Sequence, residues 1–391
     1  MVQNLPQSEM KKVLIFSTAY LPLQGGAELA IKEITDRLKG EFAFDLICAR
    51  IKKELPKREK IGAVEVWRVG RGWGKLDKIF LAWSGFRLAQ QLYRQKNYDL
   101  VWAVMASFGA LAALFFKEQF EGVPYILTLQ EGDTLGHIKK RARWLGPFYR
   151  RMFKKADIIT AISDFLKDYA RTQGAEASKI EIVPNGVDLN KFSIFNFQFS
   201  KKKIKEKLGI KEDEKVVITV SRLVEKNGVG DLIEAVGKIK EPIRLMILGS
   251  GPLEKSLKSK ARGLNLEDKI LFLGNITNDS VPEYLAISDV FVRPSLAEGL
   301  GNAFLEAMAA GVPIIGTRVG GIPDFLKDRE TGLFCEVKNP DDLAKKIVFL
   351  FNNEFLKKEI IKNARQLVEK KYRWEIISQK MGSIFSKLIN D

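Results

Sequence analysis

The sequence is poor in residues on which many enzymes build their chemistry. Histidine occurs once, as His137, and cysteine twice, as Cys48 and Cys335. A metal site with several histidines is therefore excluded, and a Ser-His-Asp triad could be built only through His137. His137 stands among lysines and arginines, so we expect an exposed imidazole rather than an enclosed base. The cysteines lie far apart in apolar runs, and we expect two buried strand thiols without a disulfide.

Signals for several other protein classes are also missing. The longest apolar run, residues 100–116, is shorter than the ~20 residues of a membrane span, and Ser107 and Gly109 divide it into a strand and a helix. The first residues lack the apolar core of a signal peptide, which favours a cytoplasmic protein. The sequence contains neither Gly-x-Gly-x-x-Gly nor a P-loop, which disfavours dehydrogenases and P-loop ATPases or kinases. No Asp-x-Asp is present to hold a divalent ion, so no metal or other cofactor is expected.

What is present is a long, basic, globular chain. A chain of 391 residues is longer than one hydrophobic core ordinarily supports, so its length predicts two domains. Its net charge of +16 predicts an anionic partner, either a small molecule, a lipid head group or a nucleic acid. Nucleic acid is disfavoured because no recognisable binding module accompanies the charge.

Short apolar strands alternate with amphipathic helices along the chain. The first series comprises KVLIFST, FAFDLICAR, VEVWRVG, DLVWAVMA, PYILTLQ and DIITAIS. Turn-rich sequence near residues 188–200 interrupts it, and a second series follows with KVVITVSR, IRLMILGSG, KILFLGN, DVFVRPS, VPIIGTR and TGLFCEV. This alternation predicts an α/β protein with two doubly wound parallel sheets, whose ligands bind at the carboxyl ends of the strands. A helical stretch from Asn339 to Asp391 closes the chain.

The segment AEGLGNAFLEAMAAG predicts a tight loop that opens a helix. Gly299, Leu300, Gly301 and Asn302 would lie at the helix N-terminus, where unpaired amides favour an anion. Glu298 and Glu306 flank the turn and suit hydroxyl groups, with Glu306 accepting from adjacent ribose hydroxyls. A nucleotide sugar would satisfy both features. A plain helix-capping turn with two solvated glutamates is the alternative.

Three further loops follow predicted strands. Arg222 and Lys226 are four residues apart in SRLVEKNG and could reach one diphosphate, or form a wet surface pair. Gly249 and Gly251 in LGSGP could admit a flat base, or make an ordinary turn. In the first series, Gly25 and Gly26 open a loop before a helix and offer another anion or sugar contact.

The order of PLQGGAE, IVPNGVD, SRLVEKNG, LGSGP, EGLGNAFLE and GTRVGGIPD resembles glycosyltransferase family 4. The resemblance covers nearly the whole chain and is strongest over residues 180–335. It implies the GT-B fold, with two Rossmann-like doubly wound domains facing a central cleft. The domains would span residues 1–190 on the acceptor side and 191–370 on the nucleotide-sugar side, with a helix at 371–391 packing back on the first.

The resemblance also implies an activity and roles. The family transfers a sugar from a nucleotide-sugar donor with retained stereochemistry and without a metal. Arg222 and Lys226 would hold the diphosphate and stabilise the leaving group, and Glu306 would bind the ribose. Glu298 would contact the transferred sugar, while the amides of residues 299–302 and Gly25 and Gly26 would contact the donor. The acceptor would be a glycan or a lipid-linked molecule, in cell-surface polysaccharide or glycolipid synthesis.

One departure from the family concerns Gln130. Many members carry a histidine after the strand that here reads YILTLQEGD, and Gln130 occupies that position. Glutamine cannot act as a base, although it can hydrogen-bond a sugar hydroxyl, and Glu131 or Asp133 could supply a carboxylate instead. Two alternatives therefore stay open: a sugar-nucleotide epimerase of the same fold, and an inactive homologue that binds a sugar nucleotide or glycan.

A basic stretch suggests a second partner. Between Ile138 and Lys155 stand eight basic residues and no acidic one, interleaved with aromatic side chains. Such a stretch suits an interfacial helix on anionic lipid and would place the protein peripherally at the inner face of the plasma membrane. The alternative is an ordinary helix with its apolar face inward. A basic protein that binds membranes or polyanions alone would need none of the four charged residues Arg222, Lys226, Glu298 and Glu306.

Overall fold

A computed structural model describes residues 10–23, 25–192 and 201–390 of the chain. Contacts divide it into two compact units. The first comprises the chain up to Glu131, Leu135–Asn185 and the segment from Trp374 onward, and the second comprises Gly132–Thr134 and Gly186–Arg373. The chain thus leaves the first unit after Asn185 and returns at Trp374, against boundaries of 190 and 370 expected from the sequence.

The first unit is built on one sheet, which has eight strands within the described residues, in the order β3-β4-β2-β1-β5-β6-β7-β8. All neighbours pair in parallel except β3 and β4, which form an antiparallel edge. The strands are β1 (Lys11–Phe16), β2 (Phe42–Ala49), β3 (Arg58–Ile61), β4 (Val64–Val69), β5 (Leu100–Val104), β6 (Tyr125–Leu129), β7 (Ile158–Ala161) and β8 (Ile180–Ile182). Most of their side chains are buried, as continuous apolar runs in a doubly covered sheet should be.

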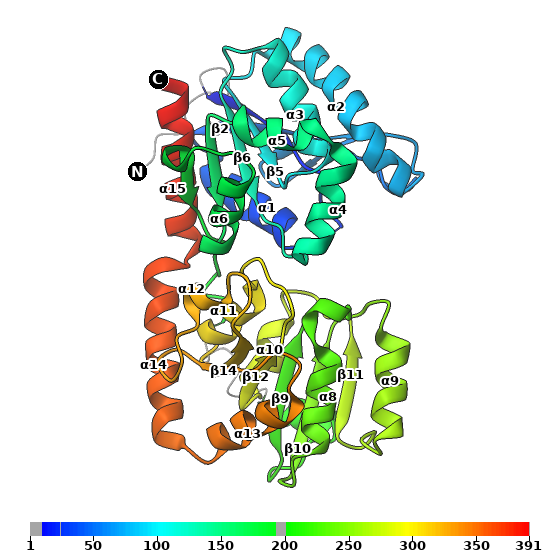
Figure 1. The fold of residues 1–391 in the computed structure, drawn as a ribbon, viewed down its shortest axis with the longest axis vertical. Helices are drawn as coiled ribbons and strands as arrows, with labels where there is room; N and C mark the ends of the chain where they lie inside the picture. The colour runs from blue at the N-terminus through cyan, green and yellow to red at the C-terminus, as the bar shows by residue number, and fades with distance from the viewer. Residues whose placement is uncertain (1–9, 24, 193–200, 391) are drawn as a thin grey trace. The chain divides into compact units, whose positions relative to one another are not determined.

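Helices cover both faces of this sheet (Figure 1). They are α1 (Gly26–Leu38), α2 (Lys75–Lys96), α3 (Phe108–Gln119), α4 (Leu135–Leu145), α5 (Pro147–Lys154), α6 (Asp164–Thr172) and α15 (Trp374–Asn390). Helices α1 and α15 pack side by side, and α2, α3 and α5 pack together. The run at residues 100–116 divides into β5 and α3, as expected.

The second unit is built on a sheet of six strands in the described residues, all parallel, in the order β11-β10-β9-β12-β13-β14. These are β9 (Lys215–Val220), β10 (Ile243–Leu248), β11 (Ile270–Gly274), β12 (Val290–Arg293), β13 (Ile314–Thr317) and β14 (Leu333–Cys335). Strand order reverses between β9 and β12, so the loops after these two strands diverge around a switch point, where doubly wound sheets bind ligands.

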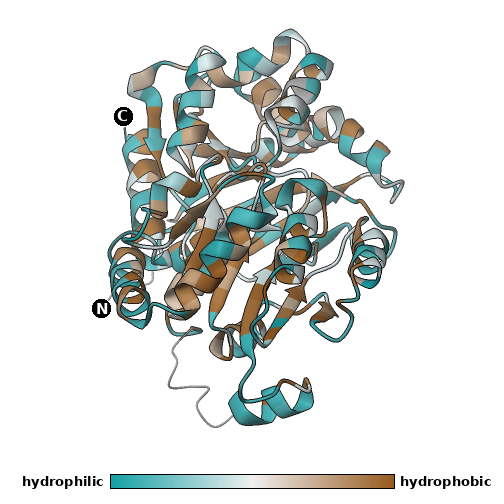
Figure 2. Ribbon diagram, turned by 60° about the horizontal axis from the view of Figure 1, so that its bottom comes forward, coloured by the Kyte–Doolittle hydropathy of each residue, from teal (hydrophilic) through white to brown (hydrophobic). Residues whose placement is uncertain are grey.

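The helices of the second unit complete its two outer layers. They are α7 (Lys201–Lys207), α8 (Val229–Gly237), α9 (Glu254–Gly263), α10 (Val281–Ala286), α11 (Asn302–Ala309), α12 (Ile322–Phe325), α13 (Pro340–Phe351) and α14 (Glu354–Lys371). A core of aliphatic side chains joins α8, α9, α13 and α14 to the strands. Strands of both sheets are largely apolar and helices mix apolar and polar residues (Figure 2), which is the expected pattern for covered sheets.

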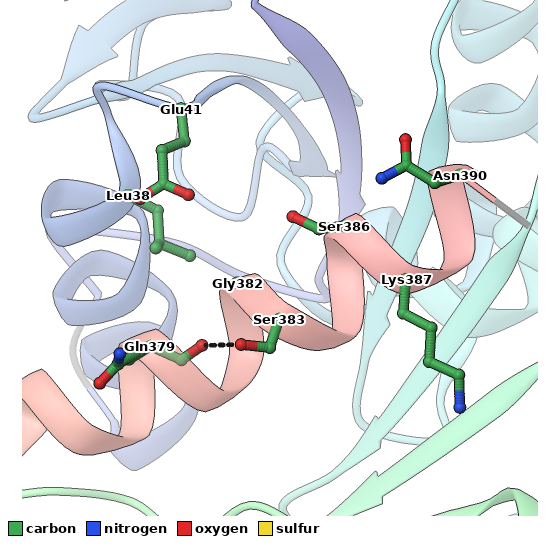
Figure 3. Close-up of a pocket in the computed structure, with 8 residues that line it drawn as sticks. All are labelled: Leu38, Glu41, Gln379, Gly382, Ser383, Ser386, Lys387 and Asn390. Carbon is green, nitrogen blue, oxygen red and sulfur yellow. Dashed lines mark hydrogen bonds between the residues drawn. The ribbon is translucent and has the colours of Figure 1, made fainter. Parts of the chain in front are cut away.

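Helix α15 completes the core of the first unit from the far end of the sequence. Phe385 is fully buried and packs edge-on against Phe42 and Trp102 at centroid distances of 5.4 Å. Gly382 faces Leu38 of α1, and a hollow lined by polar side chains of α15 lies beside this contact (Figure 3). Tyr372 and Trp374, where α15 begins, are also buried.

The strands expected from the sequence are all present, and two short ones were missed. β3 reads REKI and β8 reads IEI, so charged residues leave neither strand an apolar run that the sequence could reveal. Cys48 and Cys335 are free, buried strand residues, as predicted. Residues 193–200 of the predicted interdomain segment lie outside the described residues. No helix in the described ranges combines the length and apolar character that crossing a bilayer requires.

Candidate functional site

The loop after β9 carries Arg222 and Lys226 at the carboxyl edge of the second sheet. Arg222 is exposed, and among the described residues its guanidinium makes no hydrogen bond or ion pair. Lys226 has oxygen partners already: its ammonium donates to the Gly132 carbonyl and lies 3.6 Å from the Asp133 carboxylate. The two cations thus differ, one available to a new anion and one held by a carbonyl and a carboxylate.

A hollow of about 370 Å³ lies where β9, β10 and β11 end. Arg222 and Gly249 line it, together with four polar residues that were not predicted as site residues: Ser221, Ser250, Asn275 and Asn278. The Ser221 hydroxyl is buried and has no hydrogen-bond partner in the described part of the chain. The hollow therefore offers a cation, two amides and an unused hydroxyl to one ligand.

The glycines of LGSGP shape this edge of the sheet. Gly249 has φ +127°, and a side chain there would collide with the Ser221 carbonyl, so glycine permits the close approach of the two loops. Gly251 packs against the backbone of Leu223 and is not among the residues that line the hollow. Of the two predicted glycine contacts, only Gly249 reaches it.

The loop after β12 holds Glu298 in a fixed position. One carboxylate oxygen pairs with the Arg293 guanidinium, and the other accepts from the Gly299 N–H at 3.1 Å. Arg293 is almost fully buried at the end of β12 and lies 4.8 Å from the Phe304 ring centroid. Sequence reasoning missed Arg293, although a charged residue at the end of an apolar strand was the available signal. Because Glu298 takes the Gly299 amide, that N–H is not open to an anion.

Helix α11 begins where the sequence predicts, directly after the Gly-Leu-Gly turn. Gly301 is its N-cap with φ 97° and ψ 68°, a left-handed conformation that favours glycine. The Leu300 side chain is buried, so a ligand could meet only its backbone. Asn302 is the first helical residue and is partly exposed. The helix N-terminus thus lies beside the Glu298 carboxylate.

Glu306 lies in the middle of α11, close enough to Arg293 to feel its charge. Burial raises the pKa of Glu306 to about 7, while the positive charges of Arg293 and Lys191 oppose that rise. Arg293 therefore acts on both predicted carboxylates, through an ion pair with Glu298 and through its field at Glu306. Near neutral pH, Glu306 can both donate and accept hydrogen bonds to a diol.

In the first unit, Gly25 and Gly26 lie at the start of α1, directly after the β1 loop. Gly25 is the N-cap, and both glycines are exposed. The carboxylate of Glu28 folds back toward Gly25, where hydrogen bonds with the Gly25 and Glu28 backbones lower its pKa and burial, the larger effect, raises it. Glu28 was not predicted. Its carboxylate occupies the place at the helix start that an anion would take.

Gln130 follows β6 in the first unit. Its side-chain oxygen accepts from the Asn185 amide at 3.2 Å, and its N–H donates to Glu131 at 3.0 Å. Glu131 is 0% exposed and also accepts from the Ala106 N–H at 2.6 Å. Glu131 therefore ties the loops after β5 and β6 together, and this burial argues against the suggestion that it supplies an accessible carboxylate.

The basic stretch at residues 138–155 forms α4 and α5. The apolar residues Tyr149, Met152 and Phe153 of α5 are buried in the first unit, whereas Trp144 of α4 is 65% exposed. Half of the stretch is therefore an ordinary helix with its apolar face inward. His137 is exposed on α4, as expected.

The second unit thus brings Arg222, Lys226, Gly249, Glu298 and Glu306 to one edge of one sheet. Gly25, Gly26 and Gln130 lie at the corresponding edge of the other unit's sheet. Within residues 10–23, 25–192 and 201–390, no three His, Cys, Asp or Glu side chains gather as metal ligands would.

Comparison with known proteins identifies the family. The model described as "Glycosyl transferases group 1" matches residues 200–367, and the model described as "Glycosyltransferase Family 4" matches residues 24–191. The two models thus cover the two units almost separately.

Named relatives agree with the family models. N-acetyl-alpha-D-glucosaminyl L-malate synthase of Bacillus anthracis is 30% identical over 77% of this chain and 78% of its own length. A GDP-mannose-dependent alpha-(1-6)-phosphatidylinositol monomannoside mannosyltransferase of Mycobacterium tuberculosis is 26% identical over 95% of this chain and 97% of its own. The solved sucrose-phosphate synthase of Thermosynechococcus elongatus has a TM-score of 0.87 at 20% identity, covering 97% of this chain and 99% of that one. The predicted GT-B fold of two Rossmann-like domains is confirmed, and the chain belongs to glycosyltransferase family 4.

Proposed function

We propose that the protein is a retaining, metal-independent hexosyltransferase that uses a nucleotide-sugar donor. Arg222 and Lys226 bind the donor diphosphate, and Gly249 lines the place of the base. Glu306 binds the ribose. Glu298 contacts the transferred sugar, with the backbone of residues 299–302 beside it. The Gly25–Gly26 loop and Gln130 act from the first unit, and neither a metal nor another cofactor takes part.

The observation that carries this proposal is the hollow at the ends of β9, β10 and β11. It combines the unpaired guanidinium of Arg222 with the unused hydroxyl of Ser221 and the amides of Asn275 and Asn278. The edge of a nucleotide base can form hydrogen bonds with the two amides and the hydroxyl. The negative charge of a diphosphate can pair with the guanidinium. A purely structural turn would not need this set of donors.

The chemistry follows from where charge develops. As the bond between sugar and diphosphate breaks, negative charge grows on the leaving phosphate, and fixed cations there lower the barrier. Arg222 can supply a two-pronged contact and Lys226 a point charge, which removes the need for a divalent ion. The acceptor hydroxyl then attacks the face that the diphosphate leaves, and a donor phosphate oxygen takes its proton.

The name of one relative supports the proposed substrate classes. The mycobacterial relative is named for GDP-mannose and for a phosphatidylinositol mannoside, which is a glycolipid, whereas the Bacillus relative is named as an N-acetyl-alpha-D-glucosaminyl L-malate synthase. We propose a glycan or lipid-linked acceptor and a role in cell-surface polysaccharide or glycolipid synthesis. The protein would then work in the cytoplasm, peripherally at the inner face of the plasma membrane.

Donor binding is tested by thermal shift with UDP, GDP and ADP and their sugar conjugates, in EDTA. One nucleotide should raise the melting temperature, and Arg222→Ala or Lys226→Ala should weaken its binding about tenfold to a hundredfold, because each removes a charge-assisted contact. Arg262→Ala, an exposed arginine on α9, is the matched control. Unchanged affinity in Arg222→Ala would remove it from the diphosphate site, and a shift that EDTA abolishes would refute the metal-free donor site.

The inactive homologue remains a second candidate because of Gln130. Its side chain has a partner in Asn185 and no titrating group. Gln130→His should change turnover more than donor affinity if this position contacts the acceptor, as measured by product formation and nucleotide binding in parallel. Wild-type donor binding without transfer to any glycan or lipid acceptor would favour the inactive homologue. Donor conversion without an acceptor would favour an epimerase, and the anomeric proton coupling of the product tests retention.

A further inference from the structure

Helix α2 presents apolar side chains on two opposite sides. Its inner side, with Leu81, Gly85 and Ala89, is buried. Its outer side carries Leu76, Ile79, Phe80 and Trp83, which share one helical face, and Phe80 and Trp83 are each 55% exposed. A helix that is apolar all round is normally buried. No described residue covers this outer face, so it is a surface of the kind that marks interaction sites.

Helix α4 extends this surface. Trp144 is 65% exposed and meets Phe108 edge-on at a centroid distance of 5.7 Å. A hollow of about 430 Å³ lies between α4 and α2, and its apolar lining comes from Ile79, Phe108, Trp144 and Leu145. Trp73, in the loop before α2, adds another exposed ring. We call the outer faces of α2 and α4, with the hollow between them, the aromatic face.

The charges around the aromatic face are positive. Lys75, Lys78 and Lys140 line the hollow, and the exposed Arg87 lies 4.9 Å from the Trp83 ring centroid. The sole acidic residue from Arg71 to Lys96 is Asp77, which is buried and accepts from the Arg71 and Trp73 N–H groups. Residues 135–155 contain no acidic residue. The face is therefore apolar at its centre and cationic around it.

We infer that the aromatic face docks on an anionic lipid surface, with Phe80, Trp83 and Trp144 entering the interfacial layer and Lys75, Lys78 and Lys140 meeting the head groups. Aromatic side chains that are partly solvated prefer this interfacial layer, and nearby lysines attract anionic lipid. This inference rests on the membrane location in the proposed function. It keeps α4, which carries part of the basic stretch at residues 138–155, adds α2 and leaves out α5. The buried apolar side of α5 leaves that helix only a basic face for such a role.

Charge complementarity decides between lipid and a second copy of the chain. A symmetric pair would bring two cationic faces together, and like charges oppose that contact. An anionic leaflet satisfies the charges and covers the aromatic rings at once.

The test is flotation of the full chain with vesicles of phosphatidylcholine alone or mixed with phosphatidylglycerol. Binding should need phosphatidylglycerol and fall as salt rises. The double variants Phe80→Ser/Trp83→Ser and Lys78→Glu/Lys140→Glu, and the single variant Trp144→Ser, should each lower partitioning more than about fivefold. Phe355→Ser, 75% exposed on α14, and Lys358→Glu/Lys362→Glu are matched controls that should bind as wild type.

Wild-type partitioning in the aromatic-face variants, or equal binding to neutral vesicles, would overturn the inference. So would a dimer in sedimentation that these variants dissociate, since a second copy would then cover the face. Nucleotide binding by thermal shift in the same samples separates this failure from failure of the proposed function, because none of the substituted residues lies at the donor site.

Discussion

At the scale of single residues, Arg293 is the group that organises the candidate site. It holds Glu298 by an ion pair and lies close enough to Glu306 to lower its pKa against the effect of burial. A buried cation between two carboxylates lets both stay near one ligand without full repulsion. The candidate site would therefore depend on a residue that does not itself need to touch a ligand.

Glu306 should make stability depend on pH. Its folded pKa of about 7 lies above its ordinary value of 4.5, so between these values the folded chain holds a proton that the unfolded chain releases. Stability should fall as pH rises through this window, by up to about 3 kcal/mol. Glu306→Gln removes the effect, so its urea midpoint should exceed that of wild type above pH 7 and match it near pH 4.

Glu359→Gln, an exposed substitution on α14, is the control for this pH series. Parallel curves for wild type and Glu306→Gln from pH 5 to 8 would show that Glu306 ionises in the folded state as it does in the unfolded one.

At the scale of elements, strand positions were the easiest feature to predict. A buried parallel strand is a short apolar run, and β9, β10, β12 and β13 all appear as such. The short edge strand β3 was missed because its residues Arg58–Ile61 alternate in exposure and are mostly charged. Edge strands carry few apolar side chains, because an apolar edge would invite pairing with other chains. The apolar run that reveals a buried strand is therefore missing from them.

The sequence predicted which residues lie at the ends of strands, because this depends on their position along the backbone. It did not predict the direction in which their side chains turn. Arg222, Gly249 and Glu298 were expected at strand ends and lie there. Asn275 and Asn278 follow β11, so the same rule could have found them. That Glu298 turns toward Arg293 depends on the conformation of its own loop, and that Glu131 turns inward depends on contact with the separate loop after β5.

The start of α11 should tolerate only glycine at position 301. A Cβ there would lie 2.8 Å from the Phe304 ring and 2.9 Å from the Arg293 guanidinium, and φ is 97°. Gly301→Ala should cost about 1–2 kcal/mol in backbone strain and weaken nucleotide binding by displacing Arg293 and Glu298. Urea denaturation and nucleotide thermal shift measure the two effects.

Gly263→Ala at the end of α9 is the matched control, because the space around it is open and its φ is not positive. It should leave stability unchanged or raise it slightly. Equal effects of the two substitutions would argue that the Gly301 conformation is not required.

At the scale of the whole molecule, the two units differ in how they use the chain. The second unit is nearly continuous, from Gly186 to Arg373, and contains its own core. The first is discontinuous, since Trp374, Ile377 and Phe385 of α15 belong to the same core as Val13 and Trp102. Removal of α15 would expose apolar surface on α1, β2 and β5.

Fragments should therefore behave unequally. Residues 186–373 alone should unfold cooperatively and keep nucleotide binding, whereas residues 1–185 should lack a cooperative transition. Joining residues 374–391 to residue 185 through a flexible linker should restore it, as measured by calorimetry and near-UV circular dichroism. A cooperative 1–185 fragment of wild-type stability would contradict the role given to α15.

The return of α15 also sets the order in which the protein can mature on the ribosome. Trp374 and Phe385 emerge only after residues 186–373 have been translated, which takes roughly 10–40 s at ordinary elongation rates. During this interval the amino-terminal half exposes an apolar surface to solvent, while residues 186–373 can already form their core. The unit that is synthesised first is thus the last to finish folding, and holdase chaperones would bind the amino-terminal half of the nascent chain.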